Sequence, residues 1–110
     1  MLLALDCEPL HANLDGWLHG GLIEFVADTA MGLVARLEGD VTGSNRTLHL
    51  SVDFQEGAQV NDRVECAATV VHRTRRFVWT RCDLRRADTG IPVAACTAIQ
   101  MLQGGTDAGS

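Results

Sequence analysis

The stretch His19–Leu33, "HGGLIEFVADTAMGL", places a histidine and two glycines in front of a long apolar run that contains two carboxylates. Apolar residues recur at helical spacing from Leu22 to Leu37, and most positions between them are apolar as well. This pattern predicts a helix that begins near His19 or Gly20 and ends at about Leu37. A helix that is apolar on nearly all sides is typically buried, so we expect it to lie inside the fold.

Five strand-like segments accompany this helix. One precedes it, "LLALDCEP", and four follow it: "TLHLSVDF" (47–54), "RVECAATVVHR" (63–73), "RFVWTRCDLRR" (76–86) and "IPVAACTAIQML" (91–102). In the segment 47–54, Leu48, Leu50, Val52 and Phe54 alternate with Thr47, His49, Ser51 and Asp53, which predicts a half-buried strand. We expect an α+β fold, with one antiparallel sheet wrapped around the helix. Such a sheet exposes a face or an edge that a second copy of the chain would cover.

Length and charge exclude several classes of protein. A chain of 110 residues suits a single domain, which we place at residues 1–102, with a disordered tail at 103–110. The net charge of -5 argues against nucleic-acid binding. The N-terminus lacks the basic region of a signal peptide, and the apolar run 22–37 is too short and too acidic to span a membrane. We therefore expect a cytoplasmic protein with no membrane partner.

The four cysteines, Cys7, Cys66, Cys82 and Cys96, are widely and unevenly spaced. None has a second cysteine or a histidine at metal-ligand spacing, so we expect no metal site. An even number of cysteines also suits disulfides in a secreted chain. Because three of the four lie in apolar or alternating runs, we expect buried free thiols in a reducing compartment.

The start of the predicted helix offers a place for a negatively charged oxygen. Gly20 and Gly21 lack side chains, so another group can approach their backbone N–H donors closely. Those donors have no intrahelical partner, and the helix dipole also favours negative charge there. Such an arrangement can bind a carbonyl oxygen as it becomes an oxyanion. Paired glycines before a helix also occur as a simple turn.

Asp28 is the second unusual feature of the helix. A carboxylate among apolar residues is costly to bury unless it has partners or a task. The alternative is an exposed stripe shared with Glu24, one turn earlier. Gly20 and Asp28 are eight residues apart, which is about 12 Å along a helix axis. If they act on the same atom, they must come from two different chains.

The spacing of Asn13, Gly16, His19, Gly20 and Gly21, with Asp28 nine residues after the histidine, resembles that of hotdog-fold acyl-CoA thioesterases of the phenylacetyl-CoA thioesterase (PaaI) type. The segments "LHLSVDF", "NDRVECAATVVHRTRR" and "DTGIPVAACTAIQ" are also similar to strands of that family. The resemblance covers roughly residues 2–101. It implies the hotdog fold and the hydrolysis of an acyl- or aryl-CoA thioester to a free acid and CoA.

The resemblance also implies roles for individual residues. Asp28 matches the catalytic carboxylate, which acts as nucleophile or as general base for water. Gly20 matches the backbone N–H that polarises the thioester carbonyl, and His19 matches a residue near the thioester sulfur. Asn13 matches a polar residue that holds the water or the carboxylate. Thr47 falls where related enzymes carry a serine or threonine that assists the water.

Coenzyme A enters as part of the substrate, and no other cofactor is expected. Its phosphates suit bidentate contacts with guanidinium groups, and Arg73, Arg75 and Arg76 resemble basic positions that meet the nucleotide in this family. A solvated face of a strand pair is the alternative for these arginines. Gly21 is assigned to the substrate site together with Glu24, which stands where the family usually carries a small or apolar residue.

Self-association completes these expectations. We expect a homodimer, and two such dimers can pair into a homotetramer. Two other functions remain open: a hotdog hydratase or dehydratase, and an acyl-binding module that has lost efficient catalysis. The sequence does not indicate which acyl group is bound.

Overall fold

The structure is a computed structural model that describes residues 1–39 and 44–103. Its elements are β1 (Leu2–Asp6), the 3-10 helix η1 (Pro9–His11), α1 (Gly20–Gly39), β2 (Ser44–Phe54), β3 (Arg63–Arg73), β4 (Phe77–Arg86) and β5 (Pro92–Gln103). The predicted helix and all five predicted strands are present, with bounds that differ from the expected ones by a few residues. Of the expected tail at 103–110, Gln103 belongs to β5 and residues 104–110 lie outside the described residues.

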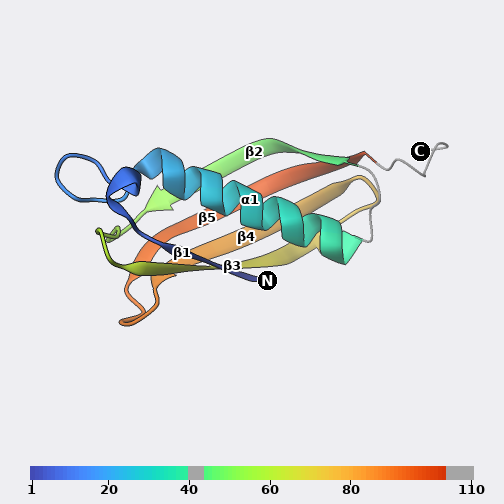
Figure 1. The fold of residues 1–110 in the computed structure, drawn as a ribbon. Helices are drawn as coiled ribbons and strands as arrows, with labels where there is room; N and C mark the ends of the chain where they lie inside the picture. The colour runs from blue at the N-terminus through green and yellow to red at the C-terminus, as the bar shows by residue number, and fades with distance from the viewer. Residues whose placement is uncertain (40–43, 104–110) are drawn as a thin grey trace.

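The five strands form one antiparallel sheet in the order β1-β3-β4-β5-β2. Helix α1 lies across one face of this sheet, as Figure 1 shows. Strand β2 follows α1 in the chain and pairs with β5, so it forms one edge of the sheet while β1 forms the other. This arrangement of one long helix on a curved antiparallel sheet is the hotdog fold, as expected.

Helix α1 begins where the carbonyl of His19 accepts a hydrogen bond from the N–H of Ile23 at 3.1 Å. Near its other end, Arg73 Nη1 donates to the carbonyl oxygen of Glu38 at 2.9 Å. A cationic side chain that binds a free carbonyl at a helix C-terminus stabilises that end of the helix. The helix is therefore fixed at both ends by residues of the surrounding loops and strands.

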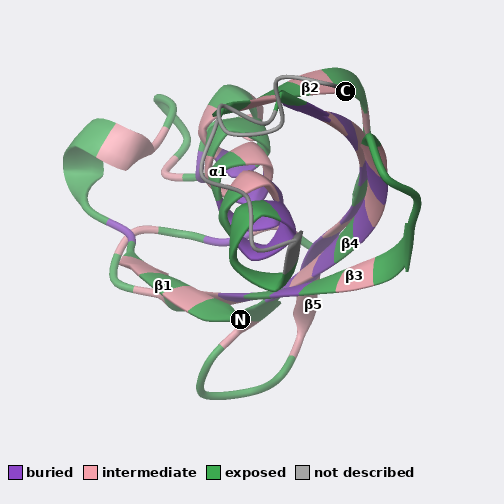
Figure 2. Cartoon of the chain, turned by 90° about the vertical axis from the view of Figure 1, so that its right-hand side faces the viewer, coloured by how far each residue is buried: buried purple, intermediate pink, exposed green. Residues whose placement is uncertain are grey.

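The helix is amphipathic rather than buried on nearly all sides, so that expectation was wrong for the single chain. Its inner face packs on the sheet through Ile23, Ala27, Ala30, Met31, Val34 and Ala35. Its outer face carries apolar side chains that remain exposed in the chain: Phe25 (67%), Leu33 (41%) and Leu37 (67%). Figure 2, a view along the helix, shows the buried side turned toward the sheet and the exposed side turned away from it. The apolar pattern of the helix thus predicts burial of its outer face, which a single chain does not provide.

Strand β2 contains a β-bulge that reverses its alternation. The register with β5 shifts between Thr47 and His49, so Leu48 becomes an additional residue. Before the bulge Asn45 and Thr47 are half-buried, whereas Leu48 and His49 are both exposed. The expected pattern, which grouped Leu48 with the buried side of the strand, was wrong at this residue. A bulge lets one strand direct polar residues inward at one end and apolar residues inward at the other.

The cysteines differ from expectation in one respect. Cys66 on β3 and Cys82 on β4 form a disulfide, with Cα atoms 6.4 Å apart, so they are not free thiols. The two lie on neighbouring strands of the sheet, a closeness that their separation in sequence does not reveal. Cys7 and Cys96 are buried free thiols, as expected. Burial raises the pKa of Cys96 to about 11, and the carboxylates of Asp83, Asp53 and Glu24 add to the rise.

The described residues contain neither a metal-binding cluster nor a membrane-spanning helix. Within 1–39 and 44–103, no cluster of histidine, cysteine, aspartate or glutamate side chains has the geometry to hold a metal ion. No helix in the same part of the chain is long and apolar enough to cross a membrane.

Candidate active site

The carboxylate of Asp28 lies in the middle of α1 and accepts a hydrogen bond from β2. Thr47 Oγ1 donates to Asp28 Oδ1 at 2.6 Å, and both residues are half-buried. This distance is typical of a hydroxyl that donates to an ionised carboxylate. The β-bulge at Leu48 turns Thr47 toward the helix, and without it the strand would alternate regularly. Two of the predicted catalytic residues therefore meet in the structure.

A surface hollow of about 230 Å³ lies beside this pair, between α1 and the ends of β2 and β5. Asn45 and Gln100 line it together with Asp28 and Thr47. Asn45 Nδ2 donates to the carbonyl oxygen of Gly32 at 3.1 Å and to Gln100 Oε1 at 3.2 Å. These bonds connect the three elements that form the hollow, so its polar groups are held in a defined arrangement.

The start of α1 presents the expected backbone donors. The carbonyl of His19 accepts from the N–H groups of Leu22 and Ile23, both at 3.1 Å, while the His19 N–H donates to the carbonyl of His11 at 3.0 Å. The N–H groups of Gly20 and Gly21 lie in the first turn, where a helix supplies no acceptor. His19 thus caps the helix through its backbone, and its side chain is exposed.

An aromatic ring covers Gly20. A Cβ atom built on this glycine would lie 3.2 Å from Cζ and 3.3 Å from Cε1 of Phe54, at the end of β2. Such separations are tighter than ordinary van der Waals contact, so the glycine permits the close approach of the ring. A Cβ on Gly21 would meet nothing within 4 Å. The two glycines therefore differ: Gly20 is packed and Gly21 is open.

Gly20 and Asp28 do not meet in this chain. Both belong to the same helix, eight residues apart, which corresponds to about 12 Å along its axis. The donors at the helix start therefore cannot bind the atom that the Asp28 carboxylate attacks or activates, unless a second chain supplies one of the two. The structure describes one chain, so this pairing remains a prediction.

Asn13 and Glu24 do not line the hollow beside Asp28. Asn13 Oδ1 accepts from the backbone N–H groups of Asp15 at 3.0 Å and Trp17 at 3.1 Å, which shapes the loop before the helix. Gly16 completes this loop with a φ of 84°, a conformation that favours glycine. Glu24 is exposed, and its negative charge contributes to the raised pKa of Cys96.

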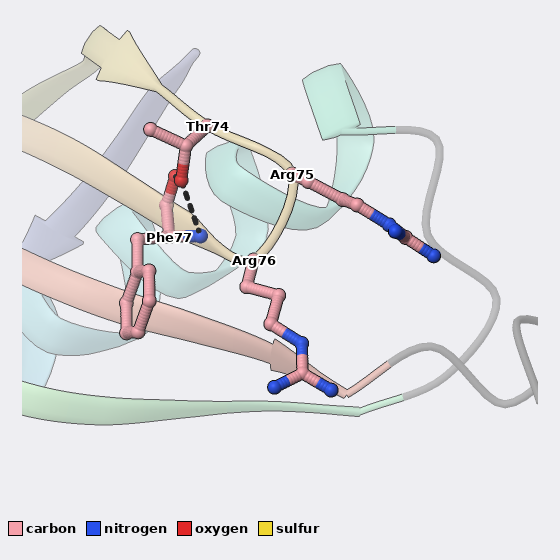
Figure 3. Close-up of a pocket in the computed structure, with 4 residues that line it drawn as sticks. All are labelled: Thr74, Arg75, Arg76 and Phe77. Atoms are coloured by element: carbon pink, nitrogen blue, oxygen red, sulfur yellow. Dashed lines mark hydrogen bonds between the residues drawn. The ribbon is translucent and has the colours of Figure 1, made fainter. Parts of the chain in front are cut away.

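Of the three predicted CoA-binding arginines, Arg75 and Arg76 line a hollow of about 450 Å³ at the β3–β4 turn, together with Thr74 and Phe77. Arg73 is the last residue of β3 and does not line this hollow. In Figure 3 the guanidinium groups of Arg75 and Arg76 extend outward from the turn. The turn is held by the Phe77 N–H, which donates to Thr74 Oγ1 at 3.2 Å. Arg73 differs from its neighbours because it donates to the end of α1.

Three residues near the site were missed by the sequence analysis: Asn45, Gln100 and Phe54. Gln100 could have been found from the sequence. It lies at every second position after Cys96 and Ala98 in an apolar strand, so its side chain is expected on the buried face. Asn45 lies two residues before Thr47 and so shares its face of the strand. The approach of Phe54 to Gly20 had no local signal, since it depends on where β2 ends relative to the helix.

Comparisons with known proteins agree with this fold. No curated protein matches the sequence. Among solved structures, a protein from Streptococcus mutans UA159 bound to acetyl-CoA has a TM-score of 0.86 and 21% identity, over 94% of this chain and 80% of the other. A hypothetical thioesterase from Streptococcus pneumoniae TIGR4, solved with coenzyme A, has a TM-score of 0.86 and 21% identity, over 94% of this chain and 77% of the other. Variants of the latter protein replace an aspartate or a threonine by alanine.

The PaaI protein of Escherichia coli, from the phenylacetic acid degradation operon, has a TM-score of 0.86 and 18% identity, over 94% of this chain and 72% of the other. At these identities the likeness establishes the fold. The sequence profile of the thioesterase superfamily matches residues 15–93, which include the helix start, Asp28 and Thr47. The chain therefore belongs to the thioesterase superfamily, and thioester hydrolysis is its class of reaction.

Proposed function

We propose that this chain hydrolyses an acyl- or aryl-CoA thioester to a free acid and CoA, with Asp28 as its catalytic carboxylate. The observation that carries the proposal is the 2.6 Å hydrogen bond from Thr47 to Asp28 at the edge of a hollow. A half-buried carboxylate beside the apolar inner face of the helix has a stability cost, and a strand whose bulge directs a hydroxyl at it suggests a functional reason for that cost.

The Thr47 bond suggests how the two carboxylate oxygens divide their tasks. Oδ1 accepts from Thr47, which fixes the orientation of the carboxylate. Oδ2 then takes the proton of a water molecule that attacks the thioester carbon, or attacks that carbon itself. The tetrahedral intermediate collapses with loss of the CoA thiolate, which is a good leaving group. The chain needs only a positioned oxygen nucleophile and a group that stabilises the oxyanion.

We assign the oxyanion group to the Gly20 N–H of a second copy of this chain. In the dimer that we propose, the start of α1 in one subunit faces the middle of α1 in the other. His19 then lies beside the thioester, and Gly21 next to Gly20 borders the substrate. Each dimer contains two such sites, related by symmetry.

Two features of the chain support self-association. The outer face of α1 exposes Phe25, Leu33 and Leu37, and β2 adds Leu48 (48%) and Phe54 (54%). Apolar groups gathered on adjacent elements are typical of a protein interface. Strand β2 is also an edge strand of eleven residues, so its outer backbone groups are available to pair with another strand.

We assign the CoA nucleotide to the β3–β4 turn. Arg75 and Arg76 border the larger hollow there and carry the positive charge that phosphates require. Arg73 takes part by holding the turn against α1. Along the helix, Glu38 lies ten residues beyond Asp28, about 15 Å away, a separation that suits the pantetheine arm between the thioester and the nucleotide.

The experiment is thiol release from a panel of aryl- and fatty-acyl-CoA esters, with wild type beside Asp28→Asn. We expect turnover of at least one ester and a fall in kcat of about two orders of magnitude or more in the variant, the scale for loss of a positioned base. Thr47→Val should cost about tenfold, because the carboxylate remains while one hydrogen bond is lost. Asp88→Asn, an exposed aspartate in the β4–β5 turn, is the matched control and should retain wild-type rates.

Equal rates in wild type and Asp28→Asn would contradict the proposal. Tight binding of acyl-CoA without turnover would instead identify an acyl-binding module, and addition of water to an unsaturated acyl-CoA would identify a hydratase.

A further inference from the structure

Gln100 is a buried amide in an apolar strand. It is 1% exposed, and it lies on the face of β5 that also carries Cys96, Ala98 and Leu102. It lines the same hollow as Asp28 and Thr47. The proposed mechanism does not use it.

A chain of hydrogen bonds fixes the orientation of the Gln100 amide. The carbonyl oxygen of Gly32 can only accept, so the group of Asn45 that faces it must be the donor Nδ2. The same Nδ2 lies 3.2 Å from Gln100, so the atom of Gln100 that faces Asn45 must be the acceptor Oε1. The amide of Gln100 therefore directs Nε2 away from Asn45, and exchanging its O and N atoms would set two donors against each other.

This orientation leaves a buried donor without an acceptor. Within the described part of the chain, Gln100 Nε2 is buried and has no hydrogen-bond partner. A buried donor in this state costs stability, and an apolar side chain of similar shape would avoid the cost. Packing therefore does not explain a glutamine at this position.

The hydroxyl oxygen of Thr47 can still accept a hydrogen bond. Its single hydroxyl proton has two acceptors within reach, Asp28 Oδ1 at 2.6 Å and Gln100 Oε1 at 3.3 Å. The nearer and charged acceptor takes it, so Thr47 Oγ1 keeps a lone pair that can accept a hydrogen bond. Acceptors on Asp28 and Thr47 and the side chain of Gln100 therefore meet at one hollow, and the donor of Gln100 is a buried atom without a partner.

We propose that Gln100 Nε2 donates to the oxygen of the water molecule that Asp28 activates. The water donates its two protons to Asp28 Oδ2 and Thr47 Oγ1, and it accepts from Gln100 Nε2. Its remaining lone pair points to the thioester carbon. When the lone pair forms the C–O bond, the proton on the Asp28 side passes to Oδ2, and the thiolate leaves on collapse of the intermediate. This assignment rests on the proposed thioesterase function and on Asp28 as general base.

The arrangement satisfies every group that it names. A buried water requires about two to four polar partners, and this one has three before it reacts. Asn45 acts as a positioning residue, because it holds the acceptor end of the Gln100 amide and thereby directs the donor end. Gln100 becomes a further catalytic residue, since it touches the reacting water.

The test compares Gln100→Met, Gln100→Glu and wild type for kcat, KM and thermal stability. Methionine has a similar length and no donor, so we expect kcat to fall about tenfold with KM unchanged and Tm equal to or above that of wild type. Glutamate keeps an acceptor toward Asn45 but replaces the donor with a second acceptor, so its kcat should fall at least as far. Gln103→Met, on an exposed residue of the same strand, is the matched control and should behave as wild type.

A structural role predicts the opposite order. If Gln100 serves only to accept from Asn45, Gln100→Glu should retain more activity than Gln100→Met, and Tm should fall together with kcat. Wild-type kcat in Gln100→Met would also overturn the proposal. If Gln100→Glu does not fold, the kcat and Tm of Gln100→Met still decide the question.

A crystal structure of the wild-type protein that resolves waters separates this inference from the function it rests on. We expect an ordered water within hydrogen-bond distance of both Gln100 Nε2 and an Asp28 oxygen. If no water occupies that position in an active enzyme, the inference is wrong while the thioesterase stands. If the water is present but no acyl-CoA is hydrolysed, the proposed function fails and the water site remains.

Discussion

The middle and the start of α1 carry different groups that the proposed catalytic site requires. The middle carries a carboxylate, Asp28, held by a hydroxyl from β2 and bordered by polar groups. The start carries backbone N–H donors at Gly20 and Gly21, with the ring of Phe54 packed over the first of them. The middle can supply a nucleophile or base but no oxyanion donor, and the start can supply the donor but no base.

This difference follows from helix geometry. Donors without partners occur only in the first turn of a helix, whereas a side chain that reaches into a hollow between helix and sheet must come from further along. In this chain the two positions are about 12 Å apart along the axis. The proposed mechanism therefore needs a second copy of the chain to bring both groups to one thioester.

A large effect, comparable with that of Asp28→Asn, is expected from removing the donor at the helix start. Gly20→Pro eliminates the N–H of the first helical residue, where proline is well tolerated because that N–H has no intrahelical partner. We expect kcat to fall about 100-fold, the scale for loss of one oxyanion donor, with Tm close to that of Gly20→Ala, which adds the same Cβ beside Phe54. The measurement is thiol release from the best ester of the panel, with Tm measured in parallel.

Gly20→Ala is the matched control, because it adds a Cβ at the same place beside the Phe54 ring but keeps the backbone N–H, so it should retain most of the activity that Gly20→Pro loses. If Gly20→Pro is folded and fully active, the helix start has no part in the reaction.

A smaller effect is expected from the β3–β4 turn, which belongs to neither half of the site. Arg75→Ala together with Arg76→Ala should weaken the binding of free CoA about tenfold, because charge-assisted contacts to phosphate are lost at an exposed site. The loss should appear in KM rather than in kcat and should shrink at high salt. Calorimetric titration with CoA measures it.

Arg81→Ala removes an exposed arginine that pairs with Asp83 on β4, and it serves as the control. Unchanged CoA affinity in the double variant would move the nucleotide to another surface of the protein.

Local signals in the sequence predicted the two features of α1 on which the proposed site depends. The glycines before the apolar run indicated the helix start, and a carboxylate within that run indicated Asp28. The separation of the two along the helix was also predictable, because it depends on residue count alone.

Long-range geometry was not predictable in the same way. The bulge at Leu48 depends on pairing between β2 and β5, so simple alternation placed Thr47 and Leu48 on the wrong faces, and only the family resemblance pointed to Thr47. The Cys66–Cys82 disulfide likewise depends on strand register. For the outer face of α1 the sequence predicted burial, but its apolar side chains are exposed in a single chain.

The most direct test of the shared site is to mix two inactive variants. Asp28→Asn and Gly20→Pro subunits are allowed to exchange, and mass spectrometry confirms that mixed dimers form. If Asp28 of one subunit acts with Gly20 of the other, each mixed dimer contains one site with both groups intact. Random exchange then restores about a quarter of wild-type activity, because half of the dimers are mixed and each has one working site of two. If activity stays at the level of the separate variants although mixed dimers are present, the two halves do not act across subunits, and the account is wrong.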